Sequence, residues 1–313
     1  MPLVLGVDTS NYTTSLACFD TENNTMVQQK KLLPVADGQL GLRQSDAVFH
    51  HTVQLPQLFD LLCEKCELNK VHAVGVSVKP SGEEKSYMPC FLSGISAATA
   101  FSKATGGILH RFSHQQGHIA AALYSAGRLD LLNERFLAFH VSGGTTQALL
   151  VEPDKDEICK VTLVASSLDL KAGQAVDRVG VMLGLKFPAG KALDELACKC
   201  DDRFKIKPVL RGCDCSLSGV ENKCKKMLEA GEPHERIAHY CIEFICAAID
   251  GMAAALLEKY GRLPLVFSGG VMSNSIISKR LTDKYSAHFA APEFSCDNAA
   301  GIAVLAAITE KYI

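Results

Sequence analysis

Short apolar runs that end in hydroxyl-rich turns open the chain. Residues 3–7 are apolar and lead into Asp8-Thr9-Ser10, and residues 16–19 are apolar again after a second group of hydroxyl side chains at 13–15. Two apolar runs joined by a tight polar turn predict a pair of antiparallel strands. The first twenty residues are therefore expected to form a β-hairpin.

The same pattern returns in the second half of the chain. Residues 136–141 are apolar, Ser142-Gly143-Gly144-Thr145-Thr146 form the turn, and residues 148–151 are apolar again. A third run, at 265–268, ends in Gly269-Gly270 and leads toward a helical segment that contains Asn274. Glycine lets the backbone approach a ligand closely, and exposed N–H groups with hydroxyls bind anions. The repeated turns therefore predict a nucleotide cleft between two related α/β halves.

Further elements complete this α/β pattern. We predict strands at 73–78 and 107–112, and helices at 92–102, 118–126, 176–185, 237–260 and 297–310. The repeat suggests an N-terminal α/β domain over 1–130, joined by the last helix at 297–313. The C-terminal α/β domain is then expected over 131–296.

Composition narrows the class of protein. The chain has 313 residues, of which 48% are hydrophobic and 21% charged, with a formal charge of -2. These values exclude a disordered chain. They also exclude a strongly positive overall charge that would attract nucleic acid, so any contact with nucleic acid needs a local basic patch. The 13 cysteines, with no basic leader before them, favour reduced thiols in a cytoplasmic protein. Glu243 and Asp250 interrupt the longest apolar run, so we expect no membrane span.

Two histidines provide candidate metal ligands. His114 and His118 lie four residues apart, which places both imidazoles on one face of a helix. Candidates for a third ligand are Asp297 and, as a further possibility, His140. Mixed imidazole and carboxylate ligation suits zinc or iron. Gln115 stands where a metalloprotease would carry its glutamate base, so protease chemistry is not supported.

Seven motifs in order identify a family. The chain contains, in this order, GVDTSNYTTS, HQQGH, VSGGTTQ, AGQAVDRVGVMLGLKFPAGKALDELA, LSGVENK, FSGGVMSN and CDNAAGIA. Together they resemble the TsaD-like tRNA threonylcarbamoyladenosine transferases, formerly called O-sialoglycoprotein endopeptidases or glycoproteases. The resemblance implies an actin/Hsp70/sugar-kinase-like fold, in which two duplicated α/β domains surround a nucleotide and metal cleft. It also implies transfer of a threonylcarbamoyl group from its adenylate to adenosine 37 of tRNA. In bacteria such proteins work with an inactive paralogue and a small ATPase.

The resemblance also implies roles for individual residues. One divalent metal ion, iron or zinc, is expected on His114, His118 and Asp297. An adenine nucleotide, threonylcarbamoyl-AMP or ATP, is expected on loop and helix residues, which are Val141, Ser142, Gly143, Gly144, Thr145, Asp177, Gly190, Asp194, Gly269, Gly270 and Asn274. Asp8 and Ser10 are candidate catalytic residues, because phosphate-processing proteins of the wider fold keep an acid near the metal at this place. A structural role for Asp8 in the turn is the alternative.

Departures from the family pattern leave the activity open. Tyr12 and Thr13 replace an acidic pair, and Asp8 replaces a glutamate. A GPG-containing turn is replaced by the segment 79–85, and glutamine stands for glutamate in HQQGH and in Gly173-Gln174-Ala175. A divergent nucleotide- and metal-binding paralogue that acts on another acceptor, or a non-catalytic scaffold, is therefore the alternative to the transferase. A sugar or protein kinase fits less well, because the histidine pair would have no role there.

Structural roles remain open for several of these residues. Asp297 could cap the last helix, Asn274 could be a turn or cap residue, and Asp177 and Asp194 could be surface charges. The cysteines at 198, 200, 213 and 215 could be free thiols or a four-thiolate metal site. Eight basic residues form a local cluster, either a solvated face or a tRNA-contacting strip. They are Lys199, Arg203, Lys205, Lys207, Arg211, Lys223, Lys225 and Lys226.

Overall fold

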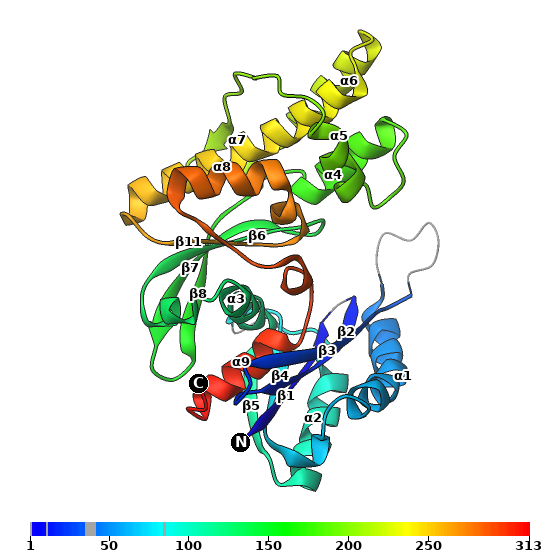
Figure 1. Cartoon of the computed structure of the whole chain (residues 1–313), viewed down its shortest axis with the longest axis vertical. Coiled ribbons are helices and arrows are strands. Elements are labelled where there is room, and N and C mark those ends of the chain that lie inside the picture. The colour runs from blue at the N-terminus through cyan, green and yellow to red at the C-terminus, as the bar shows by residue number, and fades with distance from the viewer. Residues whose placement is uncertain (1, 11, 35–41, 84–85) are drawn as a thin grey trace. The chain divides into compact units, whose positions relative to one another are not determined.

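The chain folds into two compact α/β units (Figure 1). The computed structural model describes residues 2–10, 12–34, 42–83 and 86–313. Unit 1 contains residues 1–132, 153–161 and 296–313, and unit 2 contains residues 133–152 and 162–295. Asn11, Glu84 and Lys85, which belong to the sequence motifs above, lie outside the described residues.

Unit 1 is built on a five-stranded sheet in the order β3-β2-β1-β4-β5. β1 is antiparallel to β2 and parallel to β4, which in turn is parallel to β5. Its strands are β1 Leu3–Ser10, β2 Thr13–Asp20, β3 Thr25–Leu32, β4 Val71–Lys79 and β5 Ile108–Ser113. Its helices are α1 Gln44–Cys63, α2 Phe91–Thr105, α3 His114–Ser125 and the C-terminal α9 Ala300–Thr309. The main core of unit 1 joins α1 and α2 to one face of β1, β2 and β4.

Unit 2 repeats this connectivity. Its sheet has the order β12-β11-β6-β7-β8, in which β6, β7, β8, β11 and β12 take the places of the five strands of unit 1. The strands are β6 Phe136–Val141, β7 Thr146–Asp154, β8 Ile158–Ser166, β11 Leu265–Ser268 and β12 His288–Phe289. The end of β7 and the start of β8 fall within residues 153–161, which belong to unit 1. The helices are α4 Ala172–Met182, α5 Gly190–Ala197, α6 Gly219–Glu229, α7 His234–Tyr260 and α8 Ser275–Tyr285, with a small hairpin of β9 Val209–Arg211 and β10 Asp214–Ser216. The chain is thus a duplicated α/β protein, as predicted.

Close packing of small residues attaches α9 to the second face of the unit 1 sheet. A Cβ atom on Gly6 would overlap the carbonyl oxygen of Ala299, and one on Gly75 would overlap that of Ile302. A Cβ on Gly301 would overlap the backbone of Gly117, so α9 and α3 also touch at their backbones. Helices can come this close only where no side chain separates them. The last segment of the chain is thereby fixed beside β1, β4 and α3.

The predicted strands are confirmed, while several helix boundaries differ. The helix predicted at 118–126 begins at His114 instead, because Ser113 and Gln116 form a capping box there. The helix predicted at 176–185 begins at Ala172, and the helix predicted from 297 begins at Ala300. Its start is stabilised by Asn298, whose Oδ1 accepts a hydrogen bond from the N–H of Ala300. The alternative that Asp297 caps this helix is therefore wrong.

The 27-residue helix α7 is long and apolar enough, by length and composition, to cross a membrane. Core helices satisfy the same criterion, and more than half of its most apolar window is buried within unit 2. Ile245, Ile249 and Met252 on this helix have no exposed surface and belong to the core of the unit. The absence of a membrane span stays a prediction.

Candidate functional site

Two parallel strands place a buried carboxylate at the face that α9 covers. Gly6 is level with Gly75 and Val7 with Val76, so Asp8 of β1 lies beside Ser77 of β4. Leu5 and Val7 face the core, and Gly6 and Asp8 face the other side, because side chains alternate along a strand. Asp8 is fully buried; Ser77 donates a hydrogen bond to its Oδ1, and Ser10 donates one to its Oδ2 over 2.7 Å. Its carboxylate is therefore held in one orientation.

The capping box at the start of α3 fixes the two histidines. The Ser113 hydroxyl accepts from the N–H of Gln116 at 3.2 Å, and the Gln116 side chain accepts from the N–H of Ser113 at 2.8 Å. The helix therefore begins at His114, and His118 follows one turn later on the same face. The two imidazole rings lie 4.2 Å apart, centroid to centroid.

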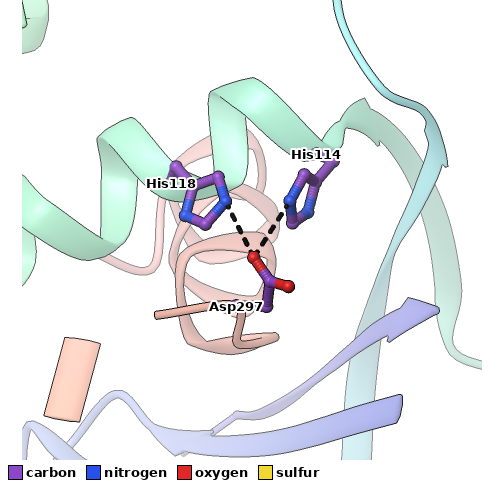
Figure 2. Close-up of side chains that lie close together, drawn as sticks. All are labelled: His114, His118 and Asp297. Atoms are coloured by element: carbon purple, nitrogen blue, oxygen red, sulfur yellow. Dashed lines mark ion pairs between the residues drawn. The ribbon is translucent and has the colours of Figure 1, made fainter. Parts of the chain in front are cut away.

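Asp297 completes a cluster of three ligand-type side chains (Figure 2). Its Oδ1 lies 3.5 Å from Nε2 of His114 and 3.3 Å from Nε2 of His118. One ligand atom from each residue lies within 4.8 Å of the other two. Among the residues that the structure describes, this is the one group of three or more His, Cys, Asp or Glu side chains with such spacing. Two imidazoles and one carboxylate are a donor set that suits zinc or iron.

Asp8 stands behind this cluster and contacts it through His114. Its Oδ1 lies 3.2 Å from Nδ1 of His114, so the opposite ring nitrogen, Nε2, faces Asp297. Burial by itself would raise the pKa of Asp8, but the charge and hydrogen bond of His114 lower it below its usual value. Burial would likewise lower the pKa of His114, but Asp8 and Asp297 together raise it to about 10. Two carboxylates thus favour a positive charge at this position.

The glycine turn of unit 2 is held open by its own hydrogen bonds. Ser142 donates its N–H to the carbonyl of Thr145 over 2.7 Å, and its hydroxyl accepts from the N–H of Thr145 over 3.2 Å. A Cβ atom added to Gly143 or Gly144 would have no other atom within 4 Å. The start of α4 lies against this turn, because the N–H of Gly173 donates to the carbonyl of Ser142 over 3.1 Å. The backbone of the turn is therefore exposed at Gly143 and Gly144. Exposed backbone N–H groups are what a phosphate or acyl group binds.

The second glycine pair, Gly269-Gly270, packs against β6, the first strand of unit 2. Gly269 has φ +97°, and a Cβ atom there would overlap the backbone of Val141. Only glycine fits a left-handed conformation with this contact. Gly270 and Gly190, by contrast, have no atom within 4 Å of an added Cβ.

Asp194 and Asn274 belong to one network, while Asp177 has a different partner. Asn274 Nδ2 donates to Asp194 Oδ1 over 2.8 Å, and Asn274 Oδ1 accepts from the N–H groups of Ile276 and Ile277. Asn274 is thus the N-cap of α8, one of its predicted alternatives. Asp177 Oδ1 accepts from the N–H of Ala189 over 2.8 Å, which ties α4 to the start of α5. Their role toward a nucleotide stays a prediction. The role of His140 as a metal ligand also stays a prediction. In this structure its Nδ1 lies 3.1 Å from the Ser268 hydroxyl.

The two glutamines that the resemblance predicts to be departures, Gln116 and Gln174, have a structural role. Gln116 and Gln174 each stand at the third position of a helix, α3 and α4, and accept from the N–H of the residue before the helix. Glutamine serves in a capping box as well as glutamate does. The Gln116 amide also donates to the carbonyls of Glu157 and Cys159, which a carboxylate cannot do. Both glutamines therefore stabilise the starts of their helices.

Thr13, one of the departures that the resemblance predicts, borders the cluster. Thr13 is buried, and its hydroxyl donates to Asp297 Oδ2 over 3.4 Å. The sequence showed this position only as a departure. It did not single out Ser77, although a serine near the end of a strand parallel to β1 was the available signal. It also missed Phe187, whose side chain is 73% exposed in the segment between Asp177 and Gly190.

The cysteine alternatives are decided for the residues that the structure describes. All thirteen cysteines lie in the described part of the chain, and none of them forms a disulfide bond. The four-thiolate alternative for the cysteines at 198, 200, 213 and 215 is not supported, because the described side chains offer one metal-type group and it contains no sulfur.

Comparison with solved structures identifies the class of fold. HypF of T. kodakarensis superposes with a TM-score of 0.61 at 12% identity, over 99% of this chain and 48% of that chain. Component A of the (R)-2-hydroxyglutaryl-CoA dehydratase of Acidaminococcus fermentans gives 0.55 at 13% identity, over 100% and 99%. With its duplicated strand order, the chain is a member of the actin/Hsp70/sugar-kinase fold class, as predicted.

Sequence comparison then gives the family. The profile described as TsaD, tRNA N6-adenosine threonylcarbamoyltransferase, matches residues 35–304. Relatives of that name from Neorickettsia sennetsu and Archaeoglobus fulgidus are 27% and 23% identical, over 96% and 99% of this chain and 92% of each relative. A third, from Lactobacillus gasseri, is 33% identical over 62% of this chain and 56% of its own. The chain belongs to the TsaD family, as the motifs predicted.

Proposed function

We propose that this protein transfers a threonylcarbamoyl group from its adenylate to N6 of adenosine 37 of tRNA. The observation that carries the proposal is the cluster of His114, His118 and Asp297, which lies inside the part of the chain that matches the family profile. In the reaction, a bond forms between N6 and the carbamoyl carbon, and the bond from that carbon to the phosphate oxygen of AMP breaks. AMP leaves as its phosphate anion, and the proton lost from N6 passes to solvent. The setting is cytoplasmic, with tRNA and the adenylate as substrates and a paralogue and a small ATPase as partner proteins.

The three clustered residues hold one divalent metal ion, iron or zinc. A bound metal of this kind polarises a carbonyl group as a Lewis acid and neutralises charge on a leaving phosphate. Both histidines face Asp297 through Nε2, and His114 is oriented from behind by Asp8. A carboxylate that fixes the second nitrogen of a ligating histidine is a common support of metal sites. Asp8 therefore acts through His114, and Ser10 and Ser77 hold Asp8.

Unit 2 supplies the adenylate site in this proposal. The uncovered backbone of the Ser142–Thr145 turn receives the phosphate or acyl end, together with Gly269 and Gly270. Asp177 and Asp194 lie at the two ends of the segment that carries Gly190, where carboxylate oxygens accept from ribose hydroxyls. The exposed Phe187 ring in the same segment offers a stacking surface for a base.

Calorimetry with a non-hydrolysable threonylcarbamoyl-adenylate analogue tests this function. The metal-loaded protein should bind the analogue at micromolar concentration or tighter, and chelation should weaken that binding at least tenfold. His118→Ala should have the same effect as chelation, while His72→Ala, an exposed histidine that hydrogen bonds a backbone carbonyl, should bind like the unaltered protein. Analogue binding that neither chelation nor His118→Ala weakens would refute the metal-assisted mechanism.

A second candidate function follows from Thr13 and Tyr12. A neutral hydroxyl contacts Asp297 where the family carries an acid, so a step that needs that acid is lost. The protein would then be a nucleotide- and metal-binding paralogue that acts on another acceptor or serves as a scaffold. Plain AMP that binds as tightly as the acyl-adenylate analogue, with no transfer to tRNA, would favour this alternative.

A further inference from the structure

A row of cations lies on the surface of unit 2. In residues 203–211, exposed and partly buried side chains alternate without interruption. The exposed positions include Arg203, Lys205, Lys207 and Arg211, and the partly buried positions between them carry Phe204, Ile206, Pro208 and Leu210. Such alternation is typical of an extended chain that lies on a surface. We call residues 203–211 the basic segment.

The apolar side chains of the basic segment attach it to α7. The Phe204 ring lies 5.1 Å from the Tyr240 ring, edge to face, and Arg236 lies over Phe204 at 5.5 Å. Further along α7, a Cβ on Gly251 would lie 2.9 Å from Pro208 Cγ and 3.2 Å from Leu210 Cδ1, so the segment needs a glycine there. Because the inward side chains pack on α7, the cations of the segment face away from it.

Three of these cations, Arg203, Lys205 and Lys207, form no ion pair within the part of the chain that the structure describes. The neighbouring acid Asp202 instead pairs with Arg236 over 2.6 Å. Asp214, which lies opposite Arg211 in the β9–β10 hairpin, accepts from the N–H of Ser166 over 2.7 Å. A row of exposed, unneutralised cations is thus left on a chain whose net charge is -2.

We propose that the basic segment binds the phosphate backbone of the RNA substrate. This inference rests on the proposed function, because it takes tRNA to be the acceptor. A regular row of cations is complementary to a regular row of phosphates, and such contacts position a nucleic acid without reading its sequence. Lys205 and Lys207 are the central contacts, and Arg203 and Arg211 extend the row.

The test compares two charge-reversed proteins of equal net charge. One carries Lys205→Glu and Lys207→Glu; the control carries Lys65→Glu and Lys103→Glu, two exposed lysines of unit 1. Binding of a fluorescent tRNA anticodon stem-loop is measured by anisotropy over a range of salt concentrations. The basic-segment variant should bind at least tenfold more weakly than the control, and its slope of log affinity against log salt should be smaller by about 2. Both variants should bind the adenylate analogue like the unaltered protein.

The outcomes separate this inference from the proposed function. Equal RNA affinity in the two variants, or no RNA binding by the unaltered protein, would overturn the inference, whatever the analogue does. The basic-segment variant is also tested for binding to vesicles that contain anionic lipid. If it no longer binds them while its RNA affinity is unchanged, the segment belongs to a membrane-binding surface and the inference is overturned. Weakened RNA binding in a protein that never binds the analogue would support the RNA surface and refute the proposed function.

Discussion

The Oδ1 atom of Asp8 lies 3.2 Å from Nδ1 of His114, and this contact joins a fully buried carboxylate to a candidate metal ligand. Ser77 and Ser10 donate to the two oxygens of the same carboxylate. The orientation of the imidazole is therefore set by β1 and β4, two strands that themselves offer no ligand.

Replacing Asp8 with asparagine tests this support. Asp8→Asn keeps the size of the side chain but removes the charge that orients His114 and favours its interaction with a metal. We expect the affinity for Zn²⁺ to fall by about 10- to 100-fold in a competition titration with a chelating dye. Asp46→Asn, an exposed residue in the first turn of α1, is the matched control and should bind like the unaltered protein. Equal affinity in both variants would show that Asp8 has only a structural role.

Metal binding is expected to release a proton. The pKa of His114 is about 10 in the metal-free protein, so at pH 8 the imidazole carries a proton that a metal must displace. Because the group is protonated below this pKa, affinity should rise about tenfold per pH unit as the pH is raised from 7 toward 10. Calorimetry in two buffers of different ionisation enthalpy measures the proton count, and release of about one proton at pH 8 is expected. No release would mean that His114 is already neutral.

Gly301 is expected to be indispensable for the approach of α9 to α3. A side chain there would meet the backbone of Gly117, which cannot move aside as a flexible side chain can. We expect Gly301→Val to lower the free energy of unfolding by about 3 kcal/mol or more and to weaken metal binding, since Asp297 precedes α9. Gly82→Ala, at a position with open space, should change the urea midpoint little. A Gly301→Val protein of unchanged stability would contradict the packing described above.

Asn274 should contribute to stability and to the position of Asp194. Asn274→Ala removes the cap of α8, which costs about 1 kcal/mol, and removes the donor to Asp194 Oδ1. We therefore expect a lower melting temperature together with weaker binding of the adenylate analogue. Asn274→Ser, which can cap the helix but does not reach as far, should recover stability without recovering analogue binding. Analogue binding that follows stability in both variants would assign Asn274 a purely structural role.

Thr13 allows a test of whether an acid at this position would affect the metal site. Its hydroxyl lies 3.4 Å from Asp297 Oδ2, so a carboxylate at this position would lie close to the metal. Thr13→Glu should raise the affinity for a divalent ion several-fold, because it adds negative charge beside two histidines and one aspartate. Thr282→Glu, at an exposed position of α8, controls for the change in net charge. The same affinity in both variants would show that position 13 does not influence the metal.

Some strands and helices could be predicted from the sequence, and others could not. Apolar runs identified β1, β4, β6 and β11, because strands buried on both faces are continuously apolar. β3 escaped notice, since it lies at the edge of its sheet and is largely polar. Helix α1 was missed although Leu55, Leu58 and Leu62 follow a helical spacing, because Pro56 interrupts the pattern. The capping residues of α3 and α4 were not recognised in the sequence. The predicted starts of these two helices were therefore four residues too late.

The sequence by itself determined the family, the fold class and the duplicated glycine turns, because these depend on local patterns and on the order of motifs. It also placed both histidines on one helix face, since a spacing of four residues suffices for that. The resemblance implied Asp297 as their partner, but only the tertiary structure brings it to them, because α9 packs on α3 through Gly301 and Gly117, which lie far apart in the sequence. Only the structure showed Asp8 behind His114, since that contact depends on the register of β1 with β4 and on the packing of α3 beside them.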